Sequence, residues 1–99
     1  MSASARPYRL SPLAQTDLED IWLYTFENWS LEQADRYQND VMAAIAELAQ
    51  GTRTGRPVGI REGYFKYAAG SHFIFYRQSD SSLDVIRVLH QRMEAPAHL

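Results

Sequence analysis

The chain has no cysteine, so neither a disulfide bond nor a thiolate metal site can contribute to its structure. No stretch approaches the roughly 18 apolar residues that a membrane-spanning helix needs, and residues 1–7 lack the apolar run of a signal peptide. We therefore expect a cytoplasmic protein that makes no use of a membrane. A glycine-rich phosphate loop, His-Glu-x-x-His and Gly-x-Ser-x-Gly are absent as well, which excludes many classes of enzyme.

Lysine is nearly absent, because nine of the ten basic residues are arginine. The formal net charge of −2 gives no sign of bulk affinity for nucleic acid. The charges are nevertheless segregated: residues 1–50 carry eight acidic and three basic residues, whereas residues 51–99 carry four acidic and seven basic residues. Since guanidinium groups suit carboxylate or phosphate recognition, the second half is the better candidate for binding an acidic partner.

Two amphipathic helices are predicted between residues 11 and 51. Ser11 and Pro12 form a cap and a first-turn proline, and the first helix is expected to end near Trp29. Ser30 and Gln33 have the spacing of a capping box that opens the second helix, which Gly51 would close. The expected apolar stripes are Ala14, Leu18, Ile21, Trp22, Thr25, Phe26 and Trp29 on the first helix, and Ala34, Tyr37, Val41, Ile45 and Leu48 on the second.

Strands are predicted on both sides of this helical hairpin. A short strand at residues 8–10 precedes it, a loop follows over residues 51–59, and three β-rich runs come next, at residues 63–68, 71–77 and 83–90. The order β-α-α-β-β-β predicts an α+β fold in which the hairpin packs on one face of a mainly antiparallel sheet. We expect residues 1–99 to form a single domain, with residues 1–7 as a flexible N-terminus and the other sheet face left for solvent or a partner.

The histidines and the clustered carboxylates suggest no chemistry. His72, His90 and His98 do not fall on adjacent turns of one helix or on one strand, so we expect no metal site, and we expect no cofactor. Asp17, Glu19 and Asp20 are expected on a solvated helix face near the helix N-terminus, where negative charge is favourable.

Basic residues on or beside the predicted strands are more informative; they are Arg61, Lys66, Arg77, Arg87, His90 and Arg92. Such side chains could support metal-free cleavage of RNA, bind a partner, or simply pair with acids such as Glu62 and Asp84. Strand aromatics, among them Tyr64 and Phe73, resemble a base-stacking platform, although strand alternation assigns about half of them to the core. On the first helix, Leu23 and Tyr24 lie outside the apolar stripe and suit a partner helix or strand.

Several segments occur in a characteristic order between residues 8 and about 98: Tyr8-Arg9-Leu10-Ser11, Asp17-Leu18-Glu19-Asp20-Ile21-Trp22, Gln33-Ala34, Arg61-Glu62-Gly63-Tyr64, residues 70–77 and residues 85–93. As an ordered set they resemble the ParE toxins of the ParE/RelE superfamily. The resemblance implies the toxin of a type II toxin-antitoxin pair, neutralised by a ParD-like antitoxin whose C-terminal segment wraps the toxin. Operator DNA would be reached only indirectly, through the antitoxin.

Toxins of the ParE type are described as poisons of DNA gyrase that trap the cleaved-DNA complex and have no catalytic residues. On this basis we expect Arg61, Arg77, Arg87, His90 and Arg92 to contact the target. Leu23 and Tyr24 are expected to contact the antitoxin. Two alternatives stay open: a ribosome-dependent mRNA endoribonuclease of the RelE type, and an inactive toxin that only binds its antitoxin. Against the first, Lys66 is the only lysine and no tyrosine follows Tyr76.

Overall fold

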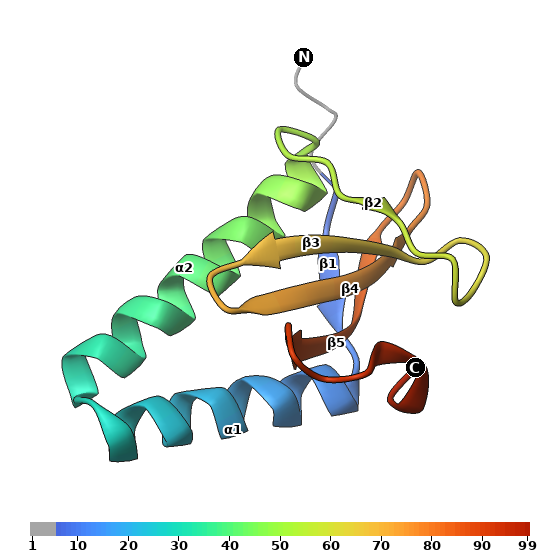
Figure 1. Ribbon diagram of the computed structural model, residues 1–99. Coiled ribbons are helices and arrows are strands. Elements are labelled where there is room, and N and C mark those ends of the chain that lie inside the picture. Colours follow the sequence, from blue (N-terminus) through green and yellow to red (C-terminus); the bar gives the residue numbers. More distant parts are fainter. Residues whose placement is uncertain (1–5) are drawn as a thin grey trace.

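Residues 6–99 are described by the computed structural model, in which two helices pack on one face of a five-stranded sheet (Figure 1). The elements are β1 (Tyr8–Leu10), α1 (Pro12–Asn28), α2 (Leu31–Gln50), β2 (Arg56–Pro57), β3 (Phe65–Ala69), β4 (His72–Gln78), β5 (Leu83–His90) and a 3-10 turn at Ala95–Ala97. The strand order is β1-β5-β4-β3-β2, with β1 parallel to β5 and all other pairs antiparallel. The predicted α+β class, with a helical hairpin on a mainly antiparallel sheet, is confirmed.

The helix boundaries are set by local capping interactions. The hydroxyl of Ser11 accepts a hydrogen bond from the N–H of Ala14 at 3.0 Å, and that of Ser30 accepts one from the N–H of Gln33 at 3.0 Å. Helix α2 ends at Gly51, whose φ of 84° lies in the left-handed region that glycine adopts without strain. These boundaries were all predicted from the sequence and are confirmed.

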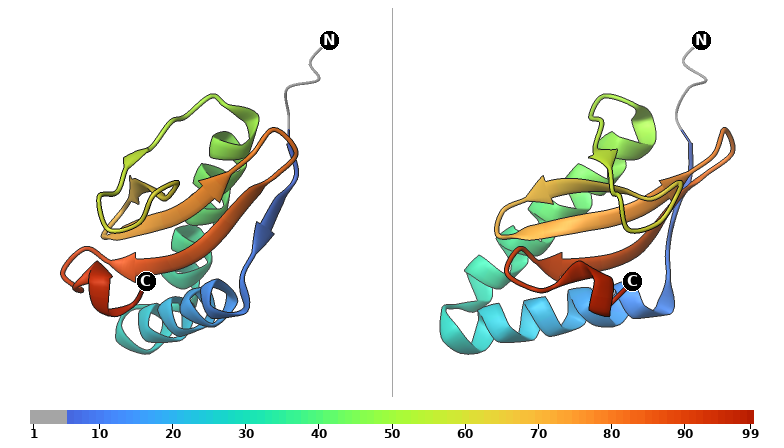
Figure 2. Two further views of the ribbon diagram at one scale, coloured as in Figure 1. Left: turned by 90° about the vertical axis from the view of Figure 1, so that its right-hand side faces the viewer. Right: turned by 45° about the vertical axis from the view of Figure 1, so that its right-hand side comes forward.

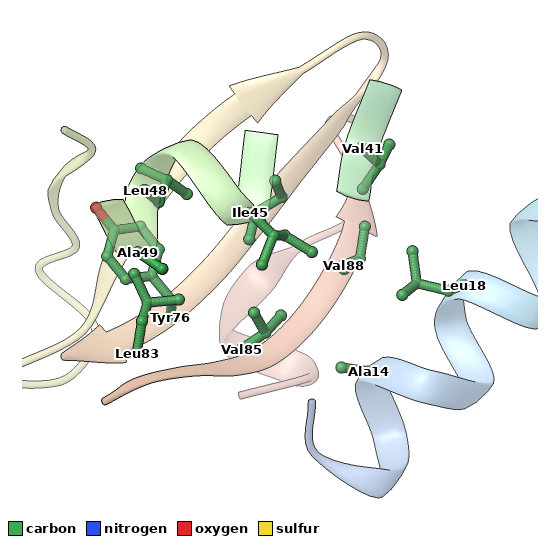
Figure 3. Packing of buried hydrophobic residues seen from close by; sticks show 11 residues of the cluster. Ala14, Leu18, Val41, Ile45, Leu48, Ala49, Tyr76, Leu83, Val85 and Val88 are labelled. Atoms are coloured by element: carbon green, nitrogen blue, oxygen red, sulfur yellow. The ribbon is translucent and has the colours of Figure 1, made fainter. Parts of the chain in front are cut away.

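The main core lies between α2, α1 and the sheet (Figure 3). The side chains of Val41, Ile45 and Leu48 follow one another along α2 at helical spacing and point toward the strands. The cluster contains Ala14, Leu18, Val41, Ile45, Leu48, Ala49, Ile74, Tyr76, Leu83, Val85 and Val88. Full burial of each large aliphatic side chain contributes about 1.5–3 kcal/mol, so this face of the sheet supplies most of the stability of the fold.

The apolar stripe expected on α1 enters this core only at its N-terminal end. Ala14 and Leu18 are buried, whereas Phe26 is 45% exposed and Trp29 is 69% exposed. Figure 1 shows the reason: the C-terminal part of α1 reaches past the β3–β4 turn, where no strand lies beneath it. The last part of the predicted apolar stripe, at Phe26 and Trp29, is therefore not buried, and the hairpin carries apolar side chains on its surface.

The second face of the sheet is covered in part by the chain itself. The side chains of Val58, Phe75 and Leu89 form a small buried cluster, with Tyr64 and Leu99 packed against it. Figure 2 shows the segment after α2 crossing this face, on the side of the sheet away from α2. The expected loop at 51–59 contains the short edge strand β2. Pro57 is tolerated there because an edge strand does not need every backbone N–H for strand pairing. We expected this face to be left for solvent or a partner. Its exposed area is smaller than that of an uncovered sheet, because the chain itself covers part of it.

The start of the described chain is tied to the end of α2. The guanidinium of Arg6 donates hydrogen bonds to the carbonyl oxygens of Ala49 and Leu48, each at 3.2 Å, and so satisfies two carbonyls of the last helical turn. The N–H of Leu83 donates to the carbonyl oxygen of Pro7 at 3.0 Å. Of the seven residues expected to be flexible, Arg6 and Pro7 are therefore anchored, and residues 1–5 lie outside the described residues.

The β3–β4 turn is held against α2 by Tyr37. Gly70 in this turn has a φ of +59°, and a Cβ there would lie 2.5 Å from Cε1 of Tyr37. We expect Gly70→Ala to destabilise the fold by about 2–4 kcal/mol, because the left-handed conformation costs an alanine about 1–2 kcal/mol and the tyrosine ring must also move. Urea unfolding measures this change, with Gly59→Ala, where a Cβ has open space, as the matched control. Equal effects of the two substitutions would contradict this account of the turn.

Candidate functional site

Two exposed arginines meet at one aromatic ring on the sheet face away from α2. Cζ of Arg61 lies 5.7 Å from the centre of the Tyr64 ring, and Cζ of Arg77 lies 5.8 Å from it. Beside them, Nζ of Lys66 lies 4.4 Å from the centre of the Phe73 ring. These distances are those of cation–π contacts, which hold cationic groups in place without neutralising them. We call these five residues the open-face cluster.

The charges of the open-face cluster are not neutralised within the described chain. Its three cations take part in none of the ion pairs found within residues 6–99. Asp84 lies opposite Arg77 in the strand register, but its carboxylate is bound by Arg9, which holds the pKa of Asp84 below its usual value. The cluster therefore presents positive charge and aromatic surface together, a combination that suits an acidic protein surface or a nucleic-acid strand.

Arg87 lies elsewhere, in a mostly buried ion pair with Asp17 of α1. Both guanidinium contacts to the carboxylate are 2.8 Å, and the side chains are only 15% and 12% exposed. The carboxylate also accepts the N–H of Val88 at 3.0 Å. The hydrogen bonds that Arg87 donates to Asp17 are the main cause of the raised pKa of Arg87. The expectation that Asp17 faces solvent was therefore wrong.

The ion pair exists because β1 is too short to cover β5. Strand β1 pairs only with residues 83–85, so the outer edge of β5 beyond Val85 has no neighbouring strand. Helix α1 takes that place: the hydroxyl of Ser11 donates to the carbonyl oxygen of Ile86 at 2.7 Å, and Asp17 accepts from Val88. Arg87 thus helps to close a sheet edge, which limits its availability to a partner.

His90 and Arg92, the other two residues expected to contact a target, lie at the opposite end of β5 from β1. His90 pairs with His72 across the strands, with ring centroids 5.2 Å apart in an edge-on arrangement. Arg92 is exposed, and its backbone N–H donates to Nδ1 of His90 at 3.1 Å. The structure therefore divides the five expected residues among the open-face cluster, the buried ion pair and this histidine end.

The two histidines line a cavity of about 490 Å³ between the helical hairpin and the ends of β4 and β5. On its inner wall, the hydroxyl of Tyr37 accepts the N–H of Ser71 at 2.9 Å and lies 2.6 Å from Nδ1 of His72. Burial raises the pKa of Tyr37. The pairing of His72 with His90 was not predicted, because it joins neighbouring strands and so brings together residues far apart in sequence. Within residues 6–99, no group of three or more His, Cys, Asp or Glu side chains is arranged to hold a metal ion.

Burial, with a smaller contribution from His90, lowers the pKa of His72 from 6.5 to about 4. Between these two pH values the unfolded chain protonates His72, whereas the folded chain keeps the ring uncharged. The free energy of unfolding that is present above pH 6.5 therefore decreases as the pH falls toward 4. Since the ring is half-buried, we expect this loss to be about 1–2 kcal/mol. Unfolding of the wild type and His72→Gln should be compared at pH 7 and pH 4.5. The wild type should lose more stability than the variant; parallel losses would show that His72 is not the titrating group.

Large apolar side chains are exposed around the end of the hairpin. Leu23 is 48% exposed and Tyr24 is 64% exposed, as their positions outside the stripe predicted. Phe26, Trp29 and Leu31 are also exposed. Their exposure was not predicted, and Phe26 and Trp29 continue the helical period of the core positions. We call these five residues the hairpin surface. Within residues 6–99, neither helix has both the length and the apolar character needed to span a bilayer.

Comparison with known proteins identifies the family of this chain. The family model described as ParE toxin of type II toxin-antitoxin system, parDE, matches residues 8–95. Toxin ParE1 of Caulobacter vibrioides is 45% identical over 95 residues, which cover 95% of this chain and 98% of that toxin. Toxin ParE1 of Mycobacterium tuberculosis is 46% identical over 94 residues, which cover 93% of this chain and 96% of that toxin.

Solved structures agree with the fold. A chain from the chromosomal ParDE toxin-antitoxin system of P. aeruginosa superposes with a TM-score of 0.77 at 16% identity, covering 89% of this chain and 98% of that chain. A chain from the RelBE2 toxin-antitoxin complex of Mycobacterium tuberculosis superposes with a TM-score of 0.56 at 23% identity, covering 92% and 97%. At these identities the likeness concerns the arrangement of helices and strands.

Proposed function

Because the chain belongs to the ParE toxin family of type II toxin-antitoxin systems, we propose that it inhibits bacterial growth by binding DNA gyrase in the cytoplasm and stabilising the cleaved-DNA complex. It does so by binding and not by catalysis. A ParD-like antitoxin neutralises it. The observation that supports the target part of this proposal is the arginine pair Arg61 and Arg77, both held against the Tyr64 ring and in none of the ion pairs found within residues 6–99.

The open-face cluster is the proposed target surface. Arginine and tyrosine are enriched among the residues that dominate binding energy at protein interfaces, and a guanidinium pair also suits backbone phosphates. A gyrase complex that holds cleaved DNA presents backbone phosphates. Arg92, which is exposed just after the end of β5, is a proposed separate contact to the target, whereas Arg87 pairs with Asp17 and helps to close the sheet edge.

The hairpin surface is the proposed antitoxin site. Leu23 and Tyr24 project from α1 with about half or more of their side-chain surface in solvent, which is costly unless a partner covers them. An antitoxin segment that buries these two side chains would contact the acidic half of the toxin, residues 1–50. Another, acidic segment of the antitoxin would suit the arginine-rich half, residues 51–99. Since the two surfaces lie on different faces, we propose an antitoxin segment long enough to reach from one to the other.

Induction of the folded chain in a bacterial host tests whether it is a toxin. We expect growth arrest that co-expression of the antitoxin encoded beside it reverses. Mapping of mRNA ends after induction separates the mechanisms: gyrase poisoning leaves translated codons uncut, whereas cuts within them would establish the RelE-type alternative. Unimpaired growth at high levels of soluble, folded chain would identify an inactive toxin that only binds its antitoxin.

A further inference from the structure

The cavity beside the histidine pair contains an acidic group and aromatic walls. Asp20 of α1 lines it, together with Tyr24, Trp29 and Tyr37. The Asp20 side chain is exposed and belongs to none of the ion pairs found within residues 6–99. No lysine or arginine is among the residues that line the cavity. Asp20 is therefore the one Asp, Glu, Lys or Arg residue among those that line the cavity.

The aromatic rings add to the attraction for a cation. Tyr24 and Trp29 are 64% and 69% exposed, so both present aromatic surface at the mouth of the cavity. The face of an aromatic ring attracts a cation, and Trp and Tyr do so more strongly than Phe. On the opposite wall, the lowered pKa of His72 keeps that imidazole uncharged at neutral pH, so it does not repel a positive group.

We propose that this cavity binds the guanidinium or ammonium group of an arginine or lysine side chain of the antitoxin, with Asp20 as its counter-ion and Tyr24 and Trp29 around its stem. The inference rests on the proposed function, because Tyr24 belongs both to the cavity and to the proposed antitoxin surface. It differs from the charge pairing expected at the arginine-rich half: here the toxin supplies the negative charge and the partner the positive one. A polypeptide is favoured over a free small cation because the exposed apolar side chains beside the cavity offer contacts to residues that flank the basic one.

Antitoxin affinity provides the main test. Asp20→Asn should raise the Kd for the purified antitoxin by about tenfold or more, with a weaker dependence on salt, because a desolvated charge pair is lost. Glu19→Gln is the matched control: it removes the same charge one residue away on α1, outside the cavity, and should change the Kd by less than about twofold. Thermal unfolding should be the same for both variants, since neither side chain forms an ion pair within residues 6–99.

Methylguanidinium chloride probes the cavity without an antitoxin. We expect saturable NMR shifts of the His72 and His90 ring protons and the Trp29 indole N–H, absent in Asp20→Asn and absent with sodium chloride at equal ionic strength. Shifts that match those with sodium chloride would overturn the cation site. Saturable shifts with no effect of Asp20→Asn on antitoxin affinity would overturn the antitoxin as its occupant, as would equal effects of Asp20→Asn and Glu19→Gln. Failure of the wild type to bind the antitoxin would instead contradict the proposed function, and the methylguanidinium titration would still decide the cation site.

Discussion

Replacing Asp17 by alanine should lower the free energy of unfolding by about 3–5 kcal/mol, the usual cost of removing one partner of a buried ion pair. The variant leaves the Arg87 guanidinium, which is 15% exposed, without a counter-charge. It also removes the acceptor of the Val88 N–H, at an edge of β5 that no strand covers. Since small domains are stable by only about 5–15 kcal/mol, much of the stability would be lost. Urea unfolding followed by tryptophan fluorescence measures the change.

Asp84→Ala is the matched control for this prediction. It removes a carboxylate that also pairs with an arginine, but the Arg9 side chain is 72% exposed, so water replaces the lost contact. The free energy of unfolding should change far less than for Asp17→Ala. If the two variants are equally stable, the ion pair between Asp17 and Arg87 is not structural. A confirmed difference has a consequence for toxicity studies, because substitutions of Arg87 would then report loss of the fold and not loss of a target contact.

Replacing Arg61 and Arg77 together by glutamine should weaken gyrase poisoning by about 1,000-fold, because arginines at interface hot spots contribute about 2 kcal/mol or more each and a factor of ten corresponds to about 1.4 kcal/mol. The two guanidinium groups share the Tyr64 ring and carry free charge, so both are expected to reach the target. The measurement is the toxin concentration that gives half-maximal DNA cleavage by gyrase. Thermal unfolding of the variant should match the wild type, since neither arginine forms an ion pair within residues 6–99.

Arg36→Glu controls for net charge in this comparison. It lowers the formal charge by the same amount as the double substitution, but at an exposed position of α2, on the other side of the sheet. The concentration for half-maximal cleavage should stay near the wild-type value. Equal losses in the two variants would show that bulk charge and not the open-face cluster determines activity. Arg92→Gln, measured in parallel, tells whether the target surface extends to the end of β5.

The local features of the fold were predictable from the sequence. Ser11, Ser30 and Gly51 act through residues only three or four positions away, so the chain itself contains the whole interaction. The strand at Leu83–His90 was predicted with its bounds because its apolar residues are dense and its ends are marked by a turn and a polar tail. The short β2 was overlooked, since two residues give no alternation to detect.

The features that the sequence did not reveal are long-range. Asp17 and Arg87 lie 70 positions apart, and nothing near either residue shows that β1 stops short and leaves an edge for α1 to close. The pairing of His72 with His90 depends on the register of β4 against β5. Trp29 continues the apolar period of α1, and only the position of the helix relative to the sheet shows that it is exposed. Periodicity assigns a residue to a face, but the length of the neighbouring element determines whether that face is covered.

The arrangement of the surfaces also bears on neutralisation. The open-face cluster and the hairpin surface lie on different sides of the sheet, so an antitoxin fragment that covers only the hairpin would leave Arg61 and Arg77 accessible. Such a fragment should bind the toxin without abolishing its contact with the target. Full neutralisation then depends on the rest of the antitoxin segment reaching the open face.

Gyrase poisoning is tested most directly by incubating the purified chain with gyrase, supercoiled plasmid and ATP, and then measuring linear DNA after detergent and protease treatment. We expect linear DNA to accumulate with increasing wild-type chain, to be suppressed by the antitoxin, and to be strongly reduced with the Arg61→Gln/Arg77→Gln variant. No linear DNA from a folded preparation that arrests growth would contradict gyrase as the target and would leave the open-face cluster to be explained by another partner.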